Sequence, residues 1–394
     1  MFLFAAALPA TQWIVDQQNG PGTHFTTIGA AVAAAVDGDT IVVRTGTYVE
    51  SVTTGKALTI LGSAVTWAMP SVTASALVVS GMPAGRTFAL SNVRLALEPE
   101  ATVPAVALVN CAGVVALGQL TSGLVSPGNA PTVVAASGCA AVHLDLCSLT
   151  GGPALALTAS TAVVADSALH GAFPQSTATG LGPARPAISA AQSRLTSSQT
   201  QLFGANGIAF GGNTALPQPA VELTASSLAI TGGAGSYLQA GSLTGVPVSA
   251  VQGAAASAVV YDGVGVLVPS GGAPNFSAGL PITLDVVPFL SVTPAPPGVA
   301  VRVELGSSPG EIVIFAVGLP ASPTAVAGVN GEAWLDVASA AVVAIATQPA
   351  SGRTTIFRTP TNSPAMRGVV LCWQGISSDL VTLDVATPVI APVL

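Results

Sequence analysis

The sequence predicts an all-β solenoid, in which short strands stack coil upon coil, followed by a smaller β-rich module. Three segments begin alike, 33 residues apart, at Pro153 (PALALTAS), Pro186 (PAISAAQS) and Pro219 (PAVELTAS). Weaker copies begin at Pro104, Pro131 and Pro247. Each segment alternates apolar residues with others, as a half-buried strand does. A strand start that recurs in repeats of varying length is typical of coils that bury their apolar positions only against the next coil.

The composition agrees with a narrow solenoid interior filled by small side chains. Half of the 394 residues are apolar, 7% are charged, and the mean hydropathy is +0.70. Because 43 glycines and 30 prolines interrupt every apolar run, no run reaches the ~18 residues that a membrane-spanning helix needs. Period-2 alternation argues against an α-solenoid, and the irregular repeat makes a β-propeller the weaker alternative. We therefore expect a soluble β protein without a membrane span.

The charge distribution excludes nucleic acid as a partner. The net charge is −7, the isoelectric point is near 4.7, and Lys56 is the single lysine. Proteins that bind nucleic acid or anionic lipid present a basic patch. We expect neither partner here.

The N-terminal stretch, residues 24–63, carries the most specific pattern. A segment with Ile28, Val32 and Val36 on one helical stripe precedes the turn at Asp37-Gly38-Asp39, and two strands follow. Its four motifs are Phe25-Thr26-Thr27-Ile28, Gly38-Asp39-Thr40-Ile41, Gly46-Thr47-Tyr48 with Glu50, and Leu58-Thr59-Ile60-Leu61-Gly62. In this combination the stretch resembles the start of pectin-lyase-like proteins. The resemblance implies a right-handed parallel β-helix capped by a short helix, with Asp37, Asp39, Arg44 and Glu50 as turn and cap residues.

Three segments are predicted. Residues 1–10 (MFLFAAALPA) are typical of the apolar core of a secretion signal, with a cleavage site at Leu8-Pro9-Ala10, so we expect an exported protein. Residues 11–280 form the β-helix. Clustered prolines between Pro281 and Pro297 indicate a boundary, and residues 281–394 contain seven short apolar segments, which predict a β-sandwich. Its Phe357-Arg358-Thr359-Pro360 and Leu371-Cys372-Trp373-Gln374-Gly375 resemble terminal modules of secreted bacterial proteins of planctomycete type.

The resemblance implies that a polysaccharide lyase or esterase of this fold would need many charged side chains on one face of the coils. Between residues 101 and 280 the charged side chains are Asp145, Asp166, Arg185, Arg194, Glu222 and Asp262. The acid–base candidates are Asp145, Asp166 and His170, with His143 nearby, because Leu144-Asp145 and Ala165-Asp166 fall in similar strands of consecutive coils. The competing interpretation is that they are turn residues.

Other candidates concern binding and cross-linking. Arg185 and Arg194 could contact an acidic glycan, and Trp334 and Trp373 could stack on sugars or fill the core of the sandwich. Cys111 and Cys139, or Cys139 and Cys147, could form a disulfide in an exported protein, or all could be buried thiols. No spacing indicates a metal site or a cofactor.

Two functions remain open. The first is a secreted or cell-surface structural or adhesion protein that binds an extracellular polysaccharide or another surface protein and has no catalytic site. The alternative is a carbohydrate-active enzyme, a polysaccharide lyase or glycoside hydrolase. A sorting or anchoring role for the C-terminal module is a third hypothesis.

Overall fold

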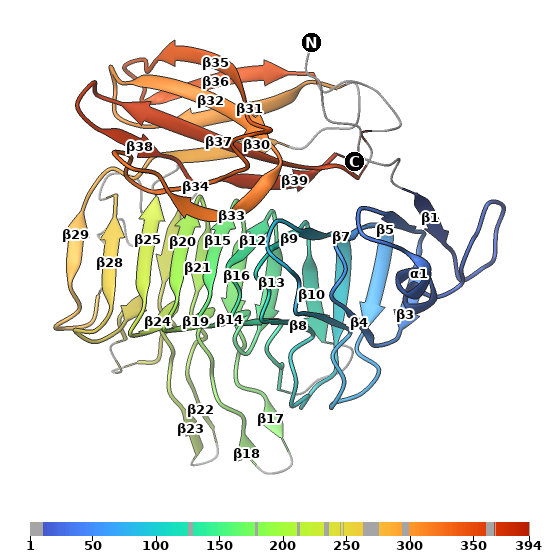
Figure 1. The fold of residues 1–394 in the computed structure, drawn as a ribbon. Helices are drawn as coiled ribbons and strands as arrows, with labels where there is room; N and C mark the ends of the chain where they lie inside the picture. The colour runs from blue at the N-terminus through green and yellow to red at the C-terminus, as the bar shows by residue number, and fades with distance from the viewer. Residues whose placement is uncertain are drawn as a thin grey trace.

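The computed structural model describes residues 11–393 apart from 125–128, 178–179, 211–212, 232–235, 245, 247, 263–275, 294–298, 360–365 and 367. The chain forms a right-handed parallel β-helix, and antiparallel strands from Phe289 onward, called the C-terminal module below, lie along one flank of it (Figure 1). The predicted all-β fold is therefore confirmed.

Each coil contributes strands to three parallel sheets. The module-facing sheet comprises β1 (Gln12–Val15), β2 (Thr40–Val43), β9 (Val114–Gly118), β12 (Ala141–Asp145), β15 (Thr161–Ala165), β20 (Arg194–Ser198), β25 (Ser227–Thr231), β28 (Ala258–Tyr261), β29 (Ile282–Leu284) and the first halves of β5 (Thr59–Ala68) and β7 (Thr87–Leu97). The lateral sheet comprises β3 (Gly46–Val49), β10 (Thr121–Leu124), β13 (Ser148–Gly151), β16 (Ala168–Gly171), β21 (Gln201–Phe203), β26 (Tyr237–Gln239) and the second halves of β5 and β7. The back sheet comprises β4 (Val52–Thr54), β6 (Leu77–Ser80), β8 (Val106–Val109), β11 (Val134–Ser137), β14 (Leu155–Thr158), β19 (Ile188–Ala191), β24 (Val221–Thr224) and β27 (Val251–Gln252).

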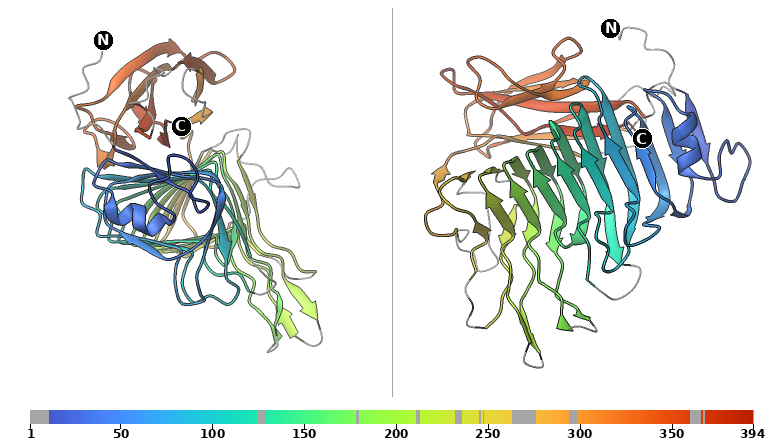
Figure 2. Two further views of the ribbon diagram at one scale, coloured as in Figure 1. Left: turned by 90° about the vertical axis from the view of Figure 1, so that its right-hand side faces the viewer. Right: turned by 60° about the horizontal axis from the view of Figure 1, so that its bottom comes forward.

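The repeat seen in the sequence sets the register of the coils. Leu155 of β14 pairs with Ile188 of β19, and Ile188 pairs with Val221 of β24. These three side chains are fully buried in one interior cluster that runs the length of the β-helix. Two short hairpins project from the corner between the lateral and back sheets (Figure 2): β17 (Ser176–Thr177) with β18 (Gly180–Leu181), and β22 (Ile208–Phe210) with β23 (Asn213–Ala215).

Sharp corners join the strands, and they correct one prediction. The sequence predicts one strand from Leu144 to Leu149, with Asp145, and one from Val164 to Leu169, with Asp166. In the structure Leu146 and Asp166 have φ angles of 53° and 44°, so each segment is split into two strands at a left-handed corner. A positive φ at a residue other than glycine is uncommon, so sequence patterns give little warning of it.

The serines that end the repeated segments stack inside the β-helix. The amide of Ser160 donates to Ser193 Oγ at 3.1 Å, and the amide of Ser193 donates to Ser226 Oγ at 3.0 Å. Each of these serines is buried and follows a left-handed corner residue. Since a buried amide needs a partner, the hydroxyl ladder satisfies the backbone at each corner.

Cys111 and Cys139 occupy the same ladder position in earlier coils, where the Ala140 amide donates to the Cys111 carbonyl at 2.8 Å. All four cysteines are free and buried in the structure. The structure thus contains neither of the disulfides considered from the sequence. Cys111, Cys139 and Cys147 belong to the interior cluster of the β-helix.

The helix α1 (Ile28–Ala34) lies across the N-terminal end of the coils (Figure 2). The carboxylate of Glu50 accepts hydrogen bonds from the amides of Ile28 and Gly29, both at 2.8 Å, as the positive end of a helix favours. Ile28 and Val32 are buried, as predicted, whereas Val36 lies beyond the helix and is 65% exposed. The predicted capping role of this segment is confirmed.

Lys56 closes the other end of α1. Its ammonium group donates to the carbonyls of Val32, Ala33 and Ala35 at 2.7–2.9 Å. We expect Lys56→Met to lower the free energy of unfolding by about 1 kcal/mol, because the last carbonyls of the helix lose both donor and charge. Thermal unfolding followed by circular dichroism measures this, with the exposed Arg94→Met as control. An unchanged midpoint would contradict the capping role.

The C-terminal module has two antiparallel sheets around a common apolar core. One sheet contains β30 (Phe289–Thr293), β31 (Val301–Gly306) and β36 (Arg353–Arg358). The other contains β32 (Ile312–Gly318), β35 (Ala341–Thr347), β37 (Val370–Ser378), β38 (Leu383–Val385) and β39 (Val389–Pro392). A hairpin of β33 (Pro320–Ala325) and β34 (Glu332–Leu335) forms a separate two-stranded sheet that packs against β37. The β-helix itself continues past residue 280, because β29 pairs in parallel with β28.

The module packs directly on the module-facing sheet. An apolar cluster joins Ala89, Val114, Ala116, Ala141 and Val163 of the β-helix to Trp334, Val370, Cys372 and Ile390 of the module. Ser322 Oγ donates to the Ala112 carbonyl at 2.7 Å, and Thr59 Oγ1 donates to the Gly368 carbonyl at 2.9 Å. The two parts of the chain therefore share a dry interface rather than only a linker.

Candidate functional site

The acid–base candidates Asp145 and Asp166 lie beneath the C-terminal module. Asp145 ends β12 with its side chain on the outer surface of the module-facing sheet, and it is 2% exposed. Asp166, at the corner after β15, accepts a hydrogen bond from Ser291 Oγ of β30 at 3.1 Å. His143, also on β12, is fully buried with Nε2 3.0 Å from the Pro388 carbonyl. The module covers all three side chains.

Burial changes the protonation of this group. Burial raises the pKa of Asp145 well above its usual value, and the charge of Asp166 adds to the rise. Burial also raises the pKa of Asp166 to about 6, against the lowering effect of the Ser291 hydroxyl. The pKa of His143 falls to about 4, because burial disfavours the charged ring. Near neutral pH, His143 is therefore uncharged, and burial favours the neutral acid of Asp145 over its carboxylate.

His170, the third acid–base candidate, is not part of this group. It lies on β16 of the lateral sheet, where its ring stacks on Phe203 with centroids 4.5 Å apart and planes 6° apart. The ring of Phe203 in turn packs on that of Tyr237, with centroids 5.2 Å apart and planes tilted by 47°. Because the rings stack along the axis of the β-helix, they cover one another's faces and support coil stacking. The carboxylates and His170 therefore do not converge in one open groove.

Two other candidates also lie at the interface. Arg194 forms an ion pair with Glu332 of β34, with 2.5 Å between NH2 and Oε1. Trp334 of the same strand is 3% exposed within the interface cluster, and Trp373 is buried in the core of the module. Neither tryptophan presents a face to which a sugar could stack.

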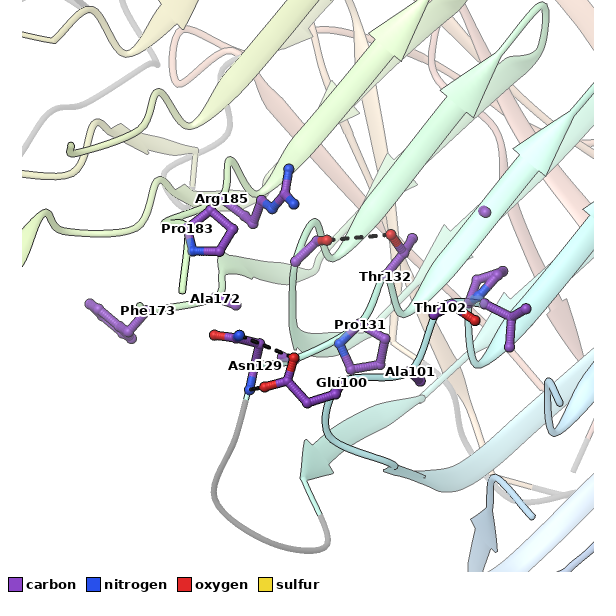
Figure 3. Close-up of a pocket in the computed structure, with 15 residues that line it drawn as sticks. Glu100, Ala101, Thr102, Asn129, Pro131, Thr132, Ala172, Phe173, Pro183 and Arg185 are labelled. Atoms are coloured by element: carbon purple, nitrogen blue, oxygen red, sulfur yellow. Dashed lines mark hydrogen bonds between the residues drawn. The ribbon is translucent and has the colours of Figure 1, made fainter. Parts of the chain in front are cut away.

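Arg185 has a different environment, since it lines a pocket at the corner between the lateral and back sheets. The pocket holds about 310 Å³ and is formed by loops of four consecutive coils. Its lining residues are Glu100, Ala101, Thr102, Val103, Pro104, Asn129, Ala130, Pro131, Thr132, Ala135, Gly152, Ala172, Phe173, Pro183 and Arg185. Figure 3 shows Arg185 beside Pro183 on one side, and Glu100 with Asn129 on the other.

The Glu100 side of the pocket is locked by hydrogen bonds between loops. The Glu100 carboxylate accepts from the Asn129 amide at 3.1 Å and from Asn129 Nδ2 at 3.2 Å, and the Glu100 amide donates to the Asn129 carbonyl at 2.9 Å. Gly182 approaches the other face of Asn129 so closely that a Cβ at this position would lie 1.7 Å from Asn129 Oδ1. The loop that carries Arg185 therefore packs closely against the Asn129 side chain.

The guanidinium of Arg185 has no acidic or carbonyl partner within the described part of the chain. Ion pairs or carbonyl groups engage Arg44, Arg86, Arg194, Arg302, Arg353, Arg358 and Lys56. Among the described cationic side chains, Arg94 on β7 also lacks such a partner. It does not line the pocket of Arg185 or the two other pockets described. Arg185 is therefore a charge available to a ligand, set beside the exposed ring of Phe173.

Sequence reasoning identified Arg185 but missed its neighbours. Glu100, Asn129 and Phe173 lie in loops outside the repeated strands, in three different coils. The unequal lengths of the repeats could have indicated these loops, because the extra residues of the longer repeats must project as loops on one face. Within the described residues no three His, Cys, Asp or Glu side chains are grouped to hold a metal ion. The one helix described is too short to cross a membrane.

Comparison with known proteins gives distant structural likenesses. No family model matches the chain, and no curated protein matches it. Pectin methylesterase from Aspergillus niger is 15% identical, with a TM-score of 0.31, covering 72% of this chain and 87% of that one. The enzymatically active domain of tailspike protein 4 from bacteriophage CBA120 is 9% identical, with a TM-score of 0.33, covering 93% and 65%. At these TM-scores neither likeness transfers a site or an activity to this chain.

Proposed function

We propose that this chain is a secreted or cell-surface β-helix protein that binds an acidic polysaccharide without cleaving it, in a structural or adhesive role. The observation that carries the proposal is the guanidinium of Arg185, which none of the described residues pairs, in a pocket of about 310 Å³. A guanidinium forms paired, charge-assisted hydrogen bonds with carboxylate or sulfate groups. Such anionic groups recur along acidic glycans.

The walls of the pocket suit a sugar ring. Phe173 is 47% exposed, and Pro104, Pro131 and Pro183 add further apolar surface. Pockets of this type combine apolar walls with a few polar groups that fix the orientation of the ligand. Here Thr102 and the Glu100–Asn129 pair supply acceptors and donors for hydroxyl groups.

The absence of cleavage is supported by the placement of the carboxylates. A general acid must reach the bond that it protonates. Asp145 and Asp166 are covered by the C-terminal module, whereas Glu100 is held by two hydrogen bonds to Asn129. No observation favours the alternative of a lyase or hydrolase, so we do not propose it.

The test is direct binding of the purified protein to pectate, alginate and a sulfated glycan, with a neutral glucan as control. We expect Arg185→Ala to weaken binding of acidic glycans roughly tenfold to a hundredfold, the loss of one charge-assisted contact. Arg94→Ala removes an equal charge elsewhere and should leave binding unchanged. Equal binding by wild type and Arg185→Ala, or equal binding of the neutral glucan, would overturn the proposal.

A further inference from the structure

Three titratable side chains lie in the contact between the β-helix and the C-terminal module. His143 and Asp145 project from the outer surface of β12, and Asp166 projects from the corner after β15. His143 contacts the module at the Pro388 carbonyl, before β39, and Asp166 contacts it at Ser291 of β30, while Asp145 is buried close enough to Asp166 to feel its charge. The strand β39 itself packs on β7, β9 and β12. Any movement of the module away from the coils would expose all three groups to water.

The interface satisfies these groups incompletely. His143 Nδ1, Asp145 Oδ1 and Gln199 Nε2 are buried and find no hydrogen-bond partner among the residues that the structure describes. A buried polar atom without a partner costs about 1–3 kcal/mol, and a buried charge costs more. The docked state therefore tolerates Asp145 only as the neutral acid, while water would accept its ionised form.

The other ionisable groups nearby do not supply a counter-charge. Glu304 of β31 faces Asp166 and raises its pKa further, although its own carboxylate is engaged by Arg302 and by Arg353 at 2.7 Å. Cys147 lies beneath Asp145, donating to its carbonyl, and Cys372 of β37 is buried in the interface cluster. The Arg194–Glu332 pair is at the margin, with the arginine side chain 56% exposed, where an ion pair contributes little.

We infer that the C-terminal module is a pH-sensitive cover of the β-helix, which docks tightly while Asp145 and Asp166 hold protons and loosens when they ionise. The interface cluster of Ala89, Ala116, Ala141, Val163 and Trp334 would be uncovered in the loosened state. The device rests on these two buried carboxyl groups, of which Asp145 finds no partner for Oδ1 among the described residues, and it is independent of the glycan pocket, which lies at another corner of the coils.

The direction follows from the protons bound in each state. The pKa of Asp166 is about 6 when docked, against an ordinary 3.8. Protonated Asp166 favours the docked state fully below pH 3.8, and this effect is lost as the pH rises to about 6. The docking equilibrium constant falls roughly a hundredfold as a result. The pKa of Asp145 is also raised in the docked state, chiefly by burial, so its ionisation weakens docking in the same direction.

His143 acts in the opposite sense. Its pKa is about 4 when docked against an ordinary 6.5, so the released state takes up a proton as the pH falls below 6.5. Docking then weakens towards pH 4 on account of this residue. Above pH 6.5 the ring is neutral in both states, so only the carboxylates contribute. A comparison of pH 6.5 with pH 8.5 therefore leaves out the contribution of His143.

Cys372 provides a natural probe of docking, since the interface buries it. The experiment measures its labelling by an aromatic disulfide reagent in the full chain, relative to the unfolded chain at the same pH, with mass spectrometry to locate the label. We expect protection of Cys372 to fall as the pH rises from 6.5 to 8.5, because ionisation of the buried carboxyl groups favours the released state. Cys111, inside the β-helix, should stay protected throughout, which separates undocking from unfolding.

Two variants decide the origin of the effect. Asp166→Asn suits the left-handed corner, keeps an oxygen for Ser291, and should raise the protection of Cys372 roughly a hundredfold above pH 7. Asp145→Asn should abolish the remaining dependence between pH 6.5 and 8.5. The control is Glu222→Gln, which removes an exposed carboxylate on β24 of the back sheet. Protection that is independent of pH in the wild type, or an unchanged pH dependence in Asp145→Asn, would overturn the inference.

Discussion

Replacement of Trp334 by alanine is expected to release the C-terminal module and to cost about 3–5 kcal/mol of stability, the usual range for truncating a buried aromatic side chain. Trp334 is 3% exposed and packs between the two parts of the chain, while its amide donates to Gln374 Oε1 at 2.9 Å. The measurement is the unfolding midpoint together with the labelling rate of Cys372.

Phe357→Ala is the matched control for this prediction. It truncates an aromatic ring of the same module that is 61% exposed, so little apolar contact is lost and the midpoint should hardly change. If Trp334→Ala retained the wild-type midpoint and the wild-type protection of Cys372, the interface described here would not exist in solution.

Replacement of Asp145 by alanine is expected to stabilise the protein at pH 8, by about 1–3 kcal/mol, because it removes a buried carboxyl without a hydrogen-bond partner for Oδ1. The sign depends on pH. Since burial raises the pKa of Asp145, the wild type loses stability as the pH rises above the ordinary value of 3.8, and the gain from alanine should shrink towards pH 4.

Chemical unfolding at both pH values measures this difference, and Glu222→Ala serves as an exposed control. A loss of stability at pH 8 would mean that the Asp145 carboxylate has a favourable partner in the folded protein. An acid–base residue of an enzyme would show the same stabilisation together with a loss of turnover. Analysis of glycan products therefore separates a catalytic Asp145 from a structural one.

The strands of the back sheet could be predicted from the sequence, whereas the corners could not. The segments starting at Pro153, Pro186 and Pro219 give β14, β19 and β24 in register. Leu146 and Asp166, by contrast, have the left-handed backbone conformation at corners, which their residue types do not predict. Stacking on neighbouring coils offsets the backbone strain at these corners. That error placed Asp166 within a strand rather than at its end.

Docking of the module was the largest feature that sequence reasoning missed. The prolines between residues 281 and 297 indicated a linker, and patterns within one strand cannot show what covers its outer surface. The available signal was the small apolar residues at outward positions of neighbouring strands, Ala89, Ala116, Ala141 and Val163. Outward positions of a sheet exposed to water are usually polar.

The candidate site was predictable in part for a similar reason. Arg185 stood out because charge is so scarce in the coils. Glu100, Asn129 and Phe173 are brought to it only by the stacking of loops from separate coils. The distance along the chain between these residues gives no measure of their distance in space.

The central claim, that the chain binds acidic glycan without cleaving it, is tested most directly by analysing the products after incubation with pectate, alginate and sulfated glycans under conditions in which binding is measured. The account predicts bound polymer of unchanged length and no new reducing or unsaturated ends, for the wild type and for Asp166→Ala alike. Release of oligosaccharides by the wild type that is lost in Asp166→Ala, with the fold retained, would contradict it.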